Sequence, residues 1–270
     1  MTNSLAAITG ASAGIGTVFA RKLAAEGYDL LLIARRGDRL RQLAAELEIA
    51  HPIHAEVCVA DLSVETEMDR VAARLAAEPR LDLLVNNAGF GVKGRFHAAP
   101  LEGQIKMHRL HIDAILRLTH AALPPMVERG RGAIVNVASV AGFVRSAGSV
   151  GYCATKSWVN AFTEGIYLDL KSVGSPVVVQ ALCPGFTYSE FHDVAGVDRA
   201  SIPKSLWMTA EDVVDQSLDG LRRRKLFVVP GWRYKLVVAL VNRIPVWLRL
   251  KLEAGTPYRR ARLPEPGNPG

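Results

Sequence analysis

The stretch TGASAGIG, residues 9–16, decides the fold of this chain. It follows a short apolar run, LAAIT (5–9), and leads into an amphipathic segment at 15–26. A strand, a glycine-rich turn and a helix in this order are typical of units that hold phosphate groups, because the helix N-terminus offers unpaired N–H groups and a positive dipole end. Glycines also permit a tight turn and close approach of a pyrophosphate. We therefore predict a dinucleotide site lined by Gly10, Ser12, Gly14, Ile15 and Gly16.

Short apolar runs alternate with longer amphipathic segments along the rest of the chain. The runs predict strands at 5–9, 29–34, 54–60, 81–86, 133–138, 176–182 and 226–230. The segments between them predict helices at 15–26, 37–48, 64–78, 103–128, 152–172 and 210–223. Such alternation favours a parallel sheet covered on both faces, with right-handed crossovers. We expect one α/β domain over 1–252, with a doubly wound parallel sheet of about seven strands and helices on both faces.

Length and composition exclude several classes of protein. The 270 residues are 49% hydrophobic, which suffices for one large core, and no apolar run is long enough to span a membrane. The N-terminus, MTNSLAAITG, lacks the basic region, apolar region and cleavage site of a signal peptide, so we expect a cytoplasmic protein. Three separated cysteines, Cys58, Cys153 and Cys183, show neither disulfide nor metal-ligand spacing. We expect no metal site, and buried cysteines, although Cys153 beside Tyr152 leaves a reactive thiol as an alternative.

Positive charge is concentrated near the C-terminus. Residues 221–262 hold twelve Lys/Arg and one acidic residue, which leaves −4 for the rest of the +7 total. No nucleic-acid docking element accompanies this charge, so we expect no nucleic-acid partner. The extension at about 231–252 mixes aliphatics, tryptophans and cations, and Pro245 divides it into two helical pieces. It can lie on a membrane surface or pack on the substrate lid or a partner subunit. The Pro- and Gly-containing tail, 253–270, is expected to be disordered.

The end of the second predicted strand determines which dinucleotide fits. An NAD site places a carboxylate there to hold the ribose 2′-hydroxyl. Here IARRGDRL (33–40) places Arg35 and Arg36 at that point, and arginine suits a 2′-phosphate. Asp38 is a rival acid, but it falls at the start of the next helix, where it resembles an N-terminal charge or cap. We predict NADP(H) as the cofactor.

The stretch GYCATK, 151–156, lies in a predicted helix. Residues four apart share a helix face, so Tyr152 and Lys156 stand side by side as a phenol and an ammonium. With the other motifs this pair makes the chain resemble the short-chain dehydrogenase/reductase family over nearly all of residues 5–230. The matching motifs are TGASAGIG (9–16), DL (61–62), NNAG (86–89), IVNVASVAG (134–142), YCATK (152–156) and PGFTYS (184–189). The resemblance implies a Rossmann-type domain and an oxidoreductase acting on CH–OH and C=O groups.

The resemblance also implies roles for individual residues. Tyr152 is expected to protonate the carbonyl oxygen, with its pKa lowered by Lys156 and by the oxidised nicotinamide. Lys156 is expected to bond the nicotinamide ribose as well, and Ser139 to bond the substrate oxygen. Asn86 is expected to tie neighbouring strands. The further residues expected at the cofactor are Asp61, Leu62, Asn87, Ala88, Gly89, Pro184, Gly185 and Thr187.

One position departs from the family pattern. The family usually has asparagine where this chain has His111, at a helix kink that holds a water relaying protons to the lysine. Imidazole donates, accepts and titrates near neutrality, so His111 can sustain the relay. The alternative is that it only fills and polarises the space. We include His111 among the catalytic candidates.

The substrate end is the least determined part of the sequence. The segment 190–208 is expected to form a lid, and its apolar residues favour a lipophilic ketone or a 3-oxoacyl compound as substrate. Apolar packing of the lid on the core explains the same residues. The family usually pairs subunits through helices such as 103–128 and 152–172, so we expect a homodimer or homotetramer. The rival to an enzyme is a catalytically impaired NADP(H)-binding sensor or membrane-surface adaptor.

Overall fold

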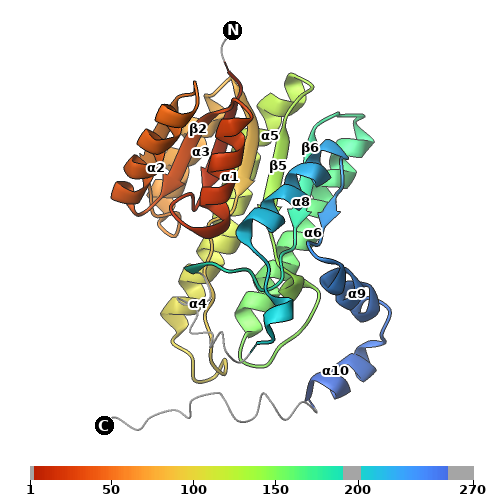
Figure 1. The fold of residues 1–270 in the computed structure, drawn as a ribbon. Coiled ribbons are helices and arrows are strands. Elements are labelled where there is room, and N and C mark those ends of the chain that lie inside the picture. Colours follow the sequence, from red (N-terminus) through yellow and green to blue (C-terminus); the bar gives the residue numbers. More distant parts are fainter. Residues whose placement is uncertain (1–2, 191–201, 255–270) are drawn as a thin grey trace, which may run out of the picture.

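The seven expected strands form one parallel sheet in the computed structural model, in the order β3-β2-β1-β4-β5-β6-β7 (Figure 1). The structure describes residues 3–190 and 202–254. The strands are β1 Leu5–Thr9, β2 Asp29–Ala34, β3 Ala55–Val59, β4 Leu81–Asn86, β5 Ala133–Val137, β6 Val178–Leu182 and β7 Phe227–Val228. The fold class predicted from the sequence is therefore confirmed. Continuous apolar strands such as β2 are buried along their whole length because helices cover both faces of the sheet.

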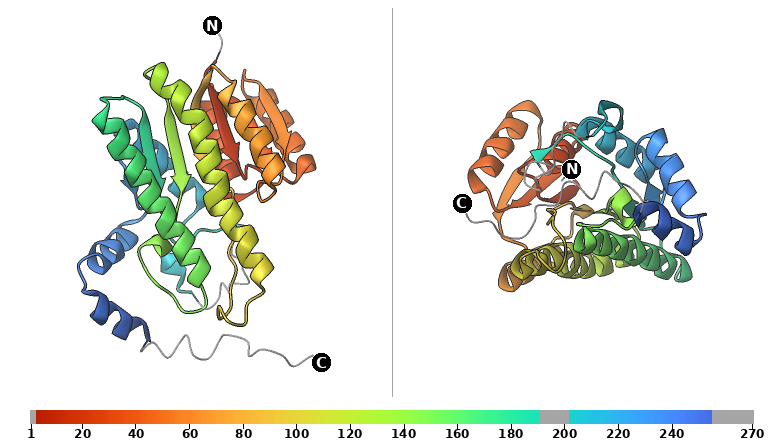
Figure 2. Two further views of the ribbon diagram at one scale, coloured as in Figure 1. Left: turned by 180° about the vertical axis from the view of Figure 1, so that it is seen from behind. Right: turned by 90° about the horizontal axis from the view of Figure 1, so that it is seen from below.

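Two helical layers enclose the sheet. Helices α1, α2 and α8 bury their apolar faces in one core, and α3, α5 and α6 do so in the other. Figure 2 shows the second layer from behind and the sheet between the layers from below. The helices are α1 Gly14–Ala25, α2 Gly37–Ala50, α3 Glu65–Ala76, α4 Leu101–His108, α5 Ala114–Glu128, α6 Val150–Ser172, α8 Ala210–Arg222, α9 Trp232–Val241 and α10 Val246–Ala254.

The expected single helix at 103–128 is divided by a π-helical turn. The turn η1 (Arg109–Asp113) lies between α4 and α5 and carries His111 into the protein interior. A π-turn inserts one extra residue into an otherwise helical run, and such insertions are frequent at functional sites. The hydrophobic periodicity of the segment did not reveal it.

The strand order reverses between β1 and β4, and the candidate site lies at this reversal. In doubly wound sheets, ligands bind beyond the carboxyl ends of the strands at such a reversal. Thr9 ends β1, and its hydroxyl oxygen accepts hydrogen bonds from the backbone N–H groups of Asn87 and Ala88, at 2.9 and 3.0 Å. The Asn87 side chain donates to the Thr9 carbonyl at 2.9 Å. The glycine-rich turn and the end of β4 are thereby fixed to one another.

A buried chain of amides connects the centre of the sheet to α6. The Asn86 side chain donates to Asn136 at 2.9 Å, and Asn136 donates to the Thr163 hydroxyl at 3.0 Å. All three side chains are almost completely buried. Burying polar groups is tolerated when they bond one another, so this chain fixes the register of β4, β5 and α6. Asn86 has the structural role expected from the sequence.

The C-terminal extension forms two helices, α9 and α10. The break between them contains Pro245, as predicted, and α10 begins at the next residue. Among residues 3–190 and 202–254, no helix is long and apolar enough to cross a membrane. Of the expected disordered tail, Glu253 and Ala254 end α10, and 255–270 lie outside the described residues. Cys58, Cys153 and Cys183 are buried, as expected.

Candidate active site

The glycine-rich turn forms a cradle with no room for side chains. Gly10 and Gly14 have φ angles of +69° and +53°, which residues with a Cβ rarely adopt. A Cβ on Gly16 would lie 2.3 Å from the Gly10 carbonyl oxygen. Ser12 and Ile15 lie in and just after this turn, as expected. The exposed N–H groups at the start of α1 and the bare backbone fit a pyrophosphate.

The two predicted phosphate-binding arginines differ in their surroundings. The Arg36 guanidinium donates to the Ser12 hydroxyl and to the Ser12 carbonyl, both at 3.2 Å, and to Glu190 at 2.7 Å. Arg35 lies away from this cluster, with its side chain 71% exposed and its Nη1 atom 3.8 Å from the Asp61 carboxylate. Arg39, one helical turn further along α2, donates to Glu190 at 2.6 Å. The sequence analysis missed Arg39, although its i+3 spacing from Arg36 could have indicated it.

Asp38 does not compete for the ribose site. Its carboxylate is fully exposed in the first turn of α2 and pairs with Arg41. This is the N-terminal helix charge that the sequence suggested.

The other expected cofactor residues gather at the same edge of the sheet. Asp61 follows β3 and accepts hydrogen bonds from the backbone and hydroxyl of Ser63, while Leu62 is buried in the core. Asn87, Ala88 and Gly89 follow β4, and a Cβ on Gly89 would lie 2.8 Å from the His111 ring. The structure therefore brings these residues to the switch point, next to the glycine-rich turn.

Ser139, Tyr152 and Lys156 meet beyond the end of β5. Ser139 begins the 3₁₀ turn η2 (Val140–Gly142), and its hydroxyl is hydrogen-bonded to that of Tyr152. Tyr152 and Lys156 lie one turn apart on α6, with the Lys156 Nζ 5.9 Å from the centre of the phenol ring. Nζ donates to the Val137 carbonyl at 2.7 Å. A tight contact with η2 holds α6 in place, because a Cβ on Gly142 would lie 2.7 Å from the Lys156 carbonyl oxygen.

A lowered tyrosine pKa is expected with oxidised nicotinamide bound, whereas in the protein alone the pKa of Tyr152 is shifted upward. Burial raises the pKa of Tyr152 to about 12, and the hydrogen bond with Ser139 opposes this only in part. Burial also lowers the pKa of Lys156 to about 8. Both shifts have the same physical cause, since a water-excluding site disfavours the charged form of either group. The sequence shows that the two side chains are neighbours but not how deeply they are buried.

His111 is completely buried and makes a hydrogen bond through each ring nitrogen. The Thr155 hydroxyl donates to the Tyr152 carbonyl at 3.0 Å, so it accepts from His111 Nδ1, also at 3.0 Å. The backbone N–H of Phe90 donates to Nε2 at 3.2 Å, which requires that nitrogen to be unprotonated. Burial and the positive charge of Lys156 hold the pKa of His111 well below 6.5. The partners thus select a neutral ring with its proton on Nδ1.

The segment after β6 is covered by the C-terminal extension. Tyr234 of α9 accepts from the Phe186 N–H at 3.0 Å and donates to the Leu206 carbonyl at 2.6 Å. A Cβ on Gly185 would lie 2.1 Å from the Tyr234 ring. The Pro184 carbonyl accepts from the Val140 N–H at 3.0 Å. Nothing in the sequence assigned Tyr234 to the site.

Aromatic side chains surround the described part of the expected lid. Trp207 stacks on Tyr188 with ring centres 4.9 Å apart and packs against Phe186 at 5.6 Å. Thr187 pairs with Met208 as an isolated parallel bridge. Phe143, which follows η2, packs on Phe227 against the core. Of the lid residues 190–208, those at 191–201 lie outside the described residues.

Comparison with known proteins identifies the family. The profile described as "short chain dehydrogenase" matches residues 4–199. The chain belongs to the short-chain dehydrogenase family. This confirms the resemblance inferred from the sequence, and with it the prediction of an oxidoreductase.

Individual relatives cover most of this dehydrogenase. A very-long-chain 3-oxoacyl-CoA reductase from Macaca fascicularis is 29% identical over 92% of the chain and 77% of its own length. The solved short-chain dehydrogenase from Sphingobium yanoikuyae in complex with NADPH is 34% identical, with a TM-score of 0.82 over 94% of this chain and 96% of that one. The bulky-bulky ketone specific alcohol dehydrogenase from Comamonas testosteroni is 29% identical, with a TM-score of 0.78 over 91% and 96%.

Burial of Lys156 is expected to lower the free energy of unfolding at neutral pH. A native pKa of about 8 in place of 10.5 means that the fold disfavours charged Lys156 by about 3 kcal/mol. This penalty is present below pH 8 and is relieved as the pH rises through the interval from 8 to 10.5, where only the unfolded chain keeps the proton. We expect Lys156→Met to increase the free energy of unfolding by about 2 kcal/mol near pH 7, since the lost bond to Val137 offsets part of the gain.

Urea unfolding across that pH interval measures this effect. The difference between Lys156→Met and the wild type should shrink as the pH rises. Lys171→Met, at an exposed lysine of the same helix that lies over the Tyr167 ring, is the matched control and should change stability by less than about 1 kcal/mol. A variant that is less stable near pH 7, or a gain that does not depend on pH, would contradict the assigned pKa.

Proposed function

We propose that this protein reduces a lipophilic ketone or 3-oxoacyl compound with NADPH, and oxidises the corresponding secondary alcohol in reverse. The observation that carries the proposal is the meeting of Ser139, Tyr152 and Lys156 beside the glycine-rich turn, at the edge where β1 and β4 end. The arginines around Ser12 supply a site for a 2′-phosphate. A similar dehydrogenase is described in complex with NADPH, which supports this cofactor.

The residues of the site suit the reductive direction. Bound NADPH supplies a hydride to the carbonyl carbon. The hydroxyls of Ser139 and Tyr152, already hydrogen-bonded to each other, hold the substrate oxygen. With a pKa of about 12, Tyr152 keeps its proton at neutral pH and donates it as negative charge develops on that oxygen. The Lys156 ammonium on the same helix face then stabilises the tyrosinate. Asp61, Leu62, Asn87, Ala88 and Gly89 line the adenosine side, and Pro184, Gly185 and Thr187 the nicotinamide side.

His111 acts in this proposal as a neutral bridge. It joins Phe90, which follows the cofactor-lining segment, to Thr155, which lies between Tyr152 and Lys156 on α6. A proton relay through the ring would require one of these two bonds to break. Of the two interpretations of His111, the geometry therefore favours the one in which it fills and polarises the space.

A lipophilic substrate is supported by the aromatic surroundings of the site. Phe186, Tyr188 and Trp207 lie together after β6, with Phe90 beside His111 on the other side. Two similar proteins carry compatible names, a very-long-chain 3-oxoacyl-CoA reductase and a bulky-bulky ketone specific alcohol dehydrogenase. We also propose that the protein pairs through α5 and α6, on which Leu116 and Leu168 are 44% and 60% exposed.

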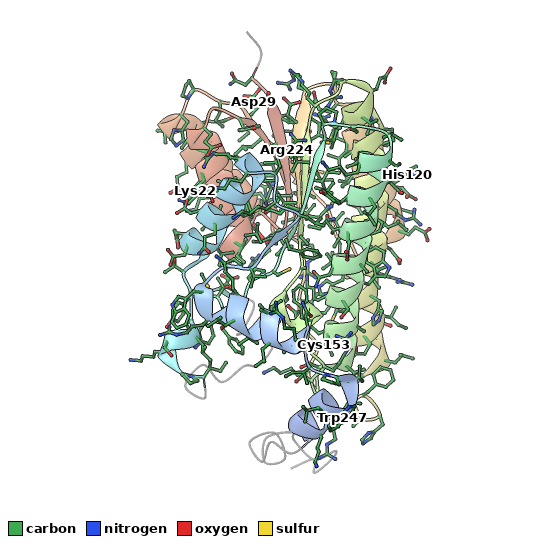
Figure 3. All side chains as sticks on the ribbon, turned by 90° about the vertical axis from the view of Figure 1, so that its right-hand side faces the viewer. Lys22, Asp29, His120, Cys153, Arg224 and Trp247 are labelled. Carbon is green, nitrogen blue, oxygen red and sulfur yellow. The ribbon has the colours of Figure 1, made fainter. Side chains whose placement is uncertain are left out.

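The exposed face of the C-terminal extension fits an anionic membrane surface. Residues 232–252 contain five Lys/Arg and no acidic residue. Tyr234 and Val238 face the protein, while Trp232 and Trp247 are 64% and 68% exposed. Figure 3 shows Trp247 on α10, remote from the sheet. Exposed tryptophans among cations are typical of helices that lie in a lipid headgroup region. A lipophilic substrate would then be collected beside the lid that α9 contacts.

Turnover with a panel of ketones tests the enzymatic proposal. We expect consumption of NADPH with bulky aromatic, steroid or 3-oxoacyl ketones and much slower consumption with NADH. Tyr152→Phe should lower kcat by roughly a thousandfold or more because the proton donor is lost, while NADPH binding stays within about twofold. Tight NADPH binding without turnover on any substrate would favour the sensor or adaptor instead.

Two substitutions separate the roles of His111. His111→Ala leaves Thr155 and the Phe90 N–H without their buried partner, and we expect kcat to fall by roughly tenfold or more. His111→Asn keeps a donor and an acceptor and should retain most of the activity. The pH profile of kcat should be the same for His111→Asn as for the wild type, because a neutral bridge does not titrate. An inflection in the wild-type pH profile of kcat that disappears in His111→Asn would instead support a proton relay through His111.

Vesicle sedimentation tests the membrane surface. We expect binding to vesicles containing phosphatidylserine, and roughly tenfold weaker binding for Trp232→Gln/Trp247→Gln. Ile49→Gln/Val173→Gln removes two apolar side chains elsewhere that are at least as exposed, and it should change nothing. Equal pelleting of both variants would end the proposal. Loss of a dimer in Trp232→Gln/Trp247→Gln would assign this face to a second copy instead.

A further inference from the structure

The Glu190 carboxylate occupies the arginine cluster next to the glycine-rich turn. One of its oxygens accepts from Arg36 at 2.7 Å and the other from Arg39 at 2.6 Å. These two hydrogen bonds keep the pKa of Glu190 below its usual value, so it is a carboxylate at neutral pH. Residues 36 and 190 are far apart in the chain, and the segment after β6 brings them together. An anion is therefore held at the point where the sequence predicts a phosphate.

The chain just before Glu190 lies over the phosphate cradle. Ser189 is so close to Gly14 that a Cβ on this glycine would lie 3.0 Å from the Ser189 Cβ. Tyr188 donates from its N–H to the Met208 carbonyl at 2.9 Å and stacks on Trp207. The contacts of Tyr188 and Ser189 with the rest of the protein thus position this segment. They place the Glu190 carboxylate against Arg36 and Arg39.

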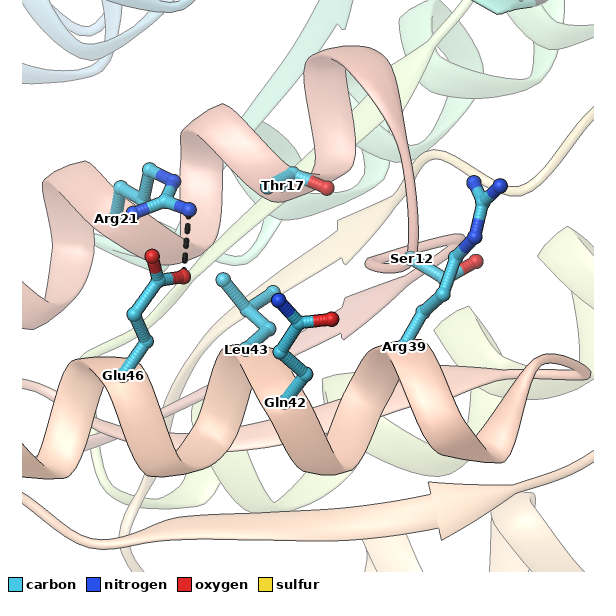
Figure 4. A pocket seen from close by; sticks show the side chains of 7 residues that line it. All are labelled: Ser12, Thr17, Arg21, Arg39, Gln42, Leu43 and Glu46. Atoms are coloured by element: carbon cyan, nitrogen blue, oxygen red, sulfur yellow. Dashed lines mark hydrogen bonds and ion pairs between the residues drawn. The ribbon is translucent and has the colours of Figure 1, made fainter.

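Arg36 does not need Glu190 for its position. Its two hydrogen bonds to Ser12 fix the guanidinium beside the glycine-rich turn. Arg39 lies on the rim of a pocket of about 220 Å³ between α1 and α2, where Figure 4 shows its guanidinium extending past Ser12. Arg35, in contrast, faces Asp61 and is mostly exposed. The pair that surrounds one anion is Arg36 with Arg39, and not Arg35 with Arg36.

We propose that the Glu190 carboxylate occupies the place of the cofactor's 2′-phosphate, that Arg36 and Arg39 are the ligands of this phosphate, and that the carboxylate competes with it. The inference rests on the proposed use of NADPH. A phosphate dianion and a carboxylate repel each other and cannot share the same two guanidinium groups. NADH carries a hydroxyl at this position and leaves the carboxylate where it is. Glu190 therefore lowers the selectivity for NADPH over NADH that the arginines alone would give.

Equilibrium binding of NADPH and NADH, followed by the fluorescence of the reduced nicotinamide, tests the proposal without turnover. We expect Glu190→Gln to lower the Kd for NADPH by roughly three- to tenfold, since exposed ion pairs of this kind are individually weak. The Kd for NADH should stay unchanged. Glu46→Gln is the matched control, because Glu46 pairs with Arg21 at 2.7 Å at the far end of the same pocket. It should change neither Kd.

Two arginine variants complete the experiment. Arg39→Gln should weaken NADPH binding by roughly tenfold and leave NADH unaffected, while Arg35→Gln should change both by less than about twofold. An unchanged or higher Kd for NADPH in Glu190→Gln would overturn the competition while the proposed function stands. The same would follow if Glu46→Gln gave an equal gain. If the wild type binds NADH more tightly than NADPH and Glu190→Gln does not reverse this order, both the cofactor proposal and the inference fail.

Discussion

Three hydrogen bonds between Thr9 and the start of the segment after β4 hold the functional edge of this protein together. They fix the glycine-rich turn against Asn87 and Ala88 at the point where the strand order reverses. These hydrogen bonds bring Asn87 and Ala88 so close to Gly10 that a side chain at position 10 would clash with both residues. Every other part of the site is placed relative to this junction, since β5 and β6 end at the same edge.

The fold could be predicted almost completely from the sequence. Strands such as DLLLIA are uninterrupted apolar runs, and the bounds expected for β1, β2 and β4 agree with the structure to the residue. The proximity of Tyr152 and Lys156 follows from helix geometry alone. The features that could not be predicted depend on how the chain packs in three dimensions. The π-turn at His111 leaves no mark in the periodicity, and the pairing of Glu190 with Arg39 joins residues 151 positions apart. Burial, which raises the pKa of Tyr152, is a property of the assembled core.

The site combines groups whose charges the surrounding protein disfavours. The same burial that keeps the proton on Tyr152 also makes charged Lys156 costly, and His111 stays neutral between two partners. Unfavourable burial of ionisable groups is usual at functional sites, and its free-energy cost is offset elsewhere in the fold. Here the buried amides of Asn86 and Asn136, hydrogen-bonded across β4, β5 and α6, belong to the rigid frame that carries it.

The ring of Tyr234 fills the space that a side chain at position 185 would need. A residue from the C-terminal extension and a glycine of the site therefore form one unit, although 49 positions separate them. The extension and the loop that it covers must therefore match one another. The same restriction applies to engineering. A chimera that receives the extension of a relative must also receive the loop at 184–186, and an exchange of either part alone leaves a clash or an unfilled space beside the reacting groups.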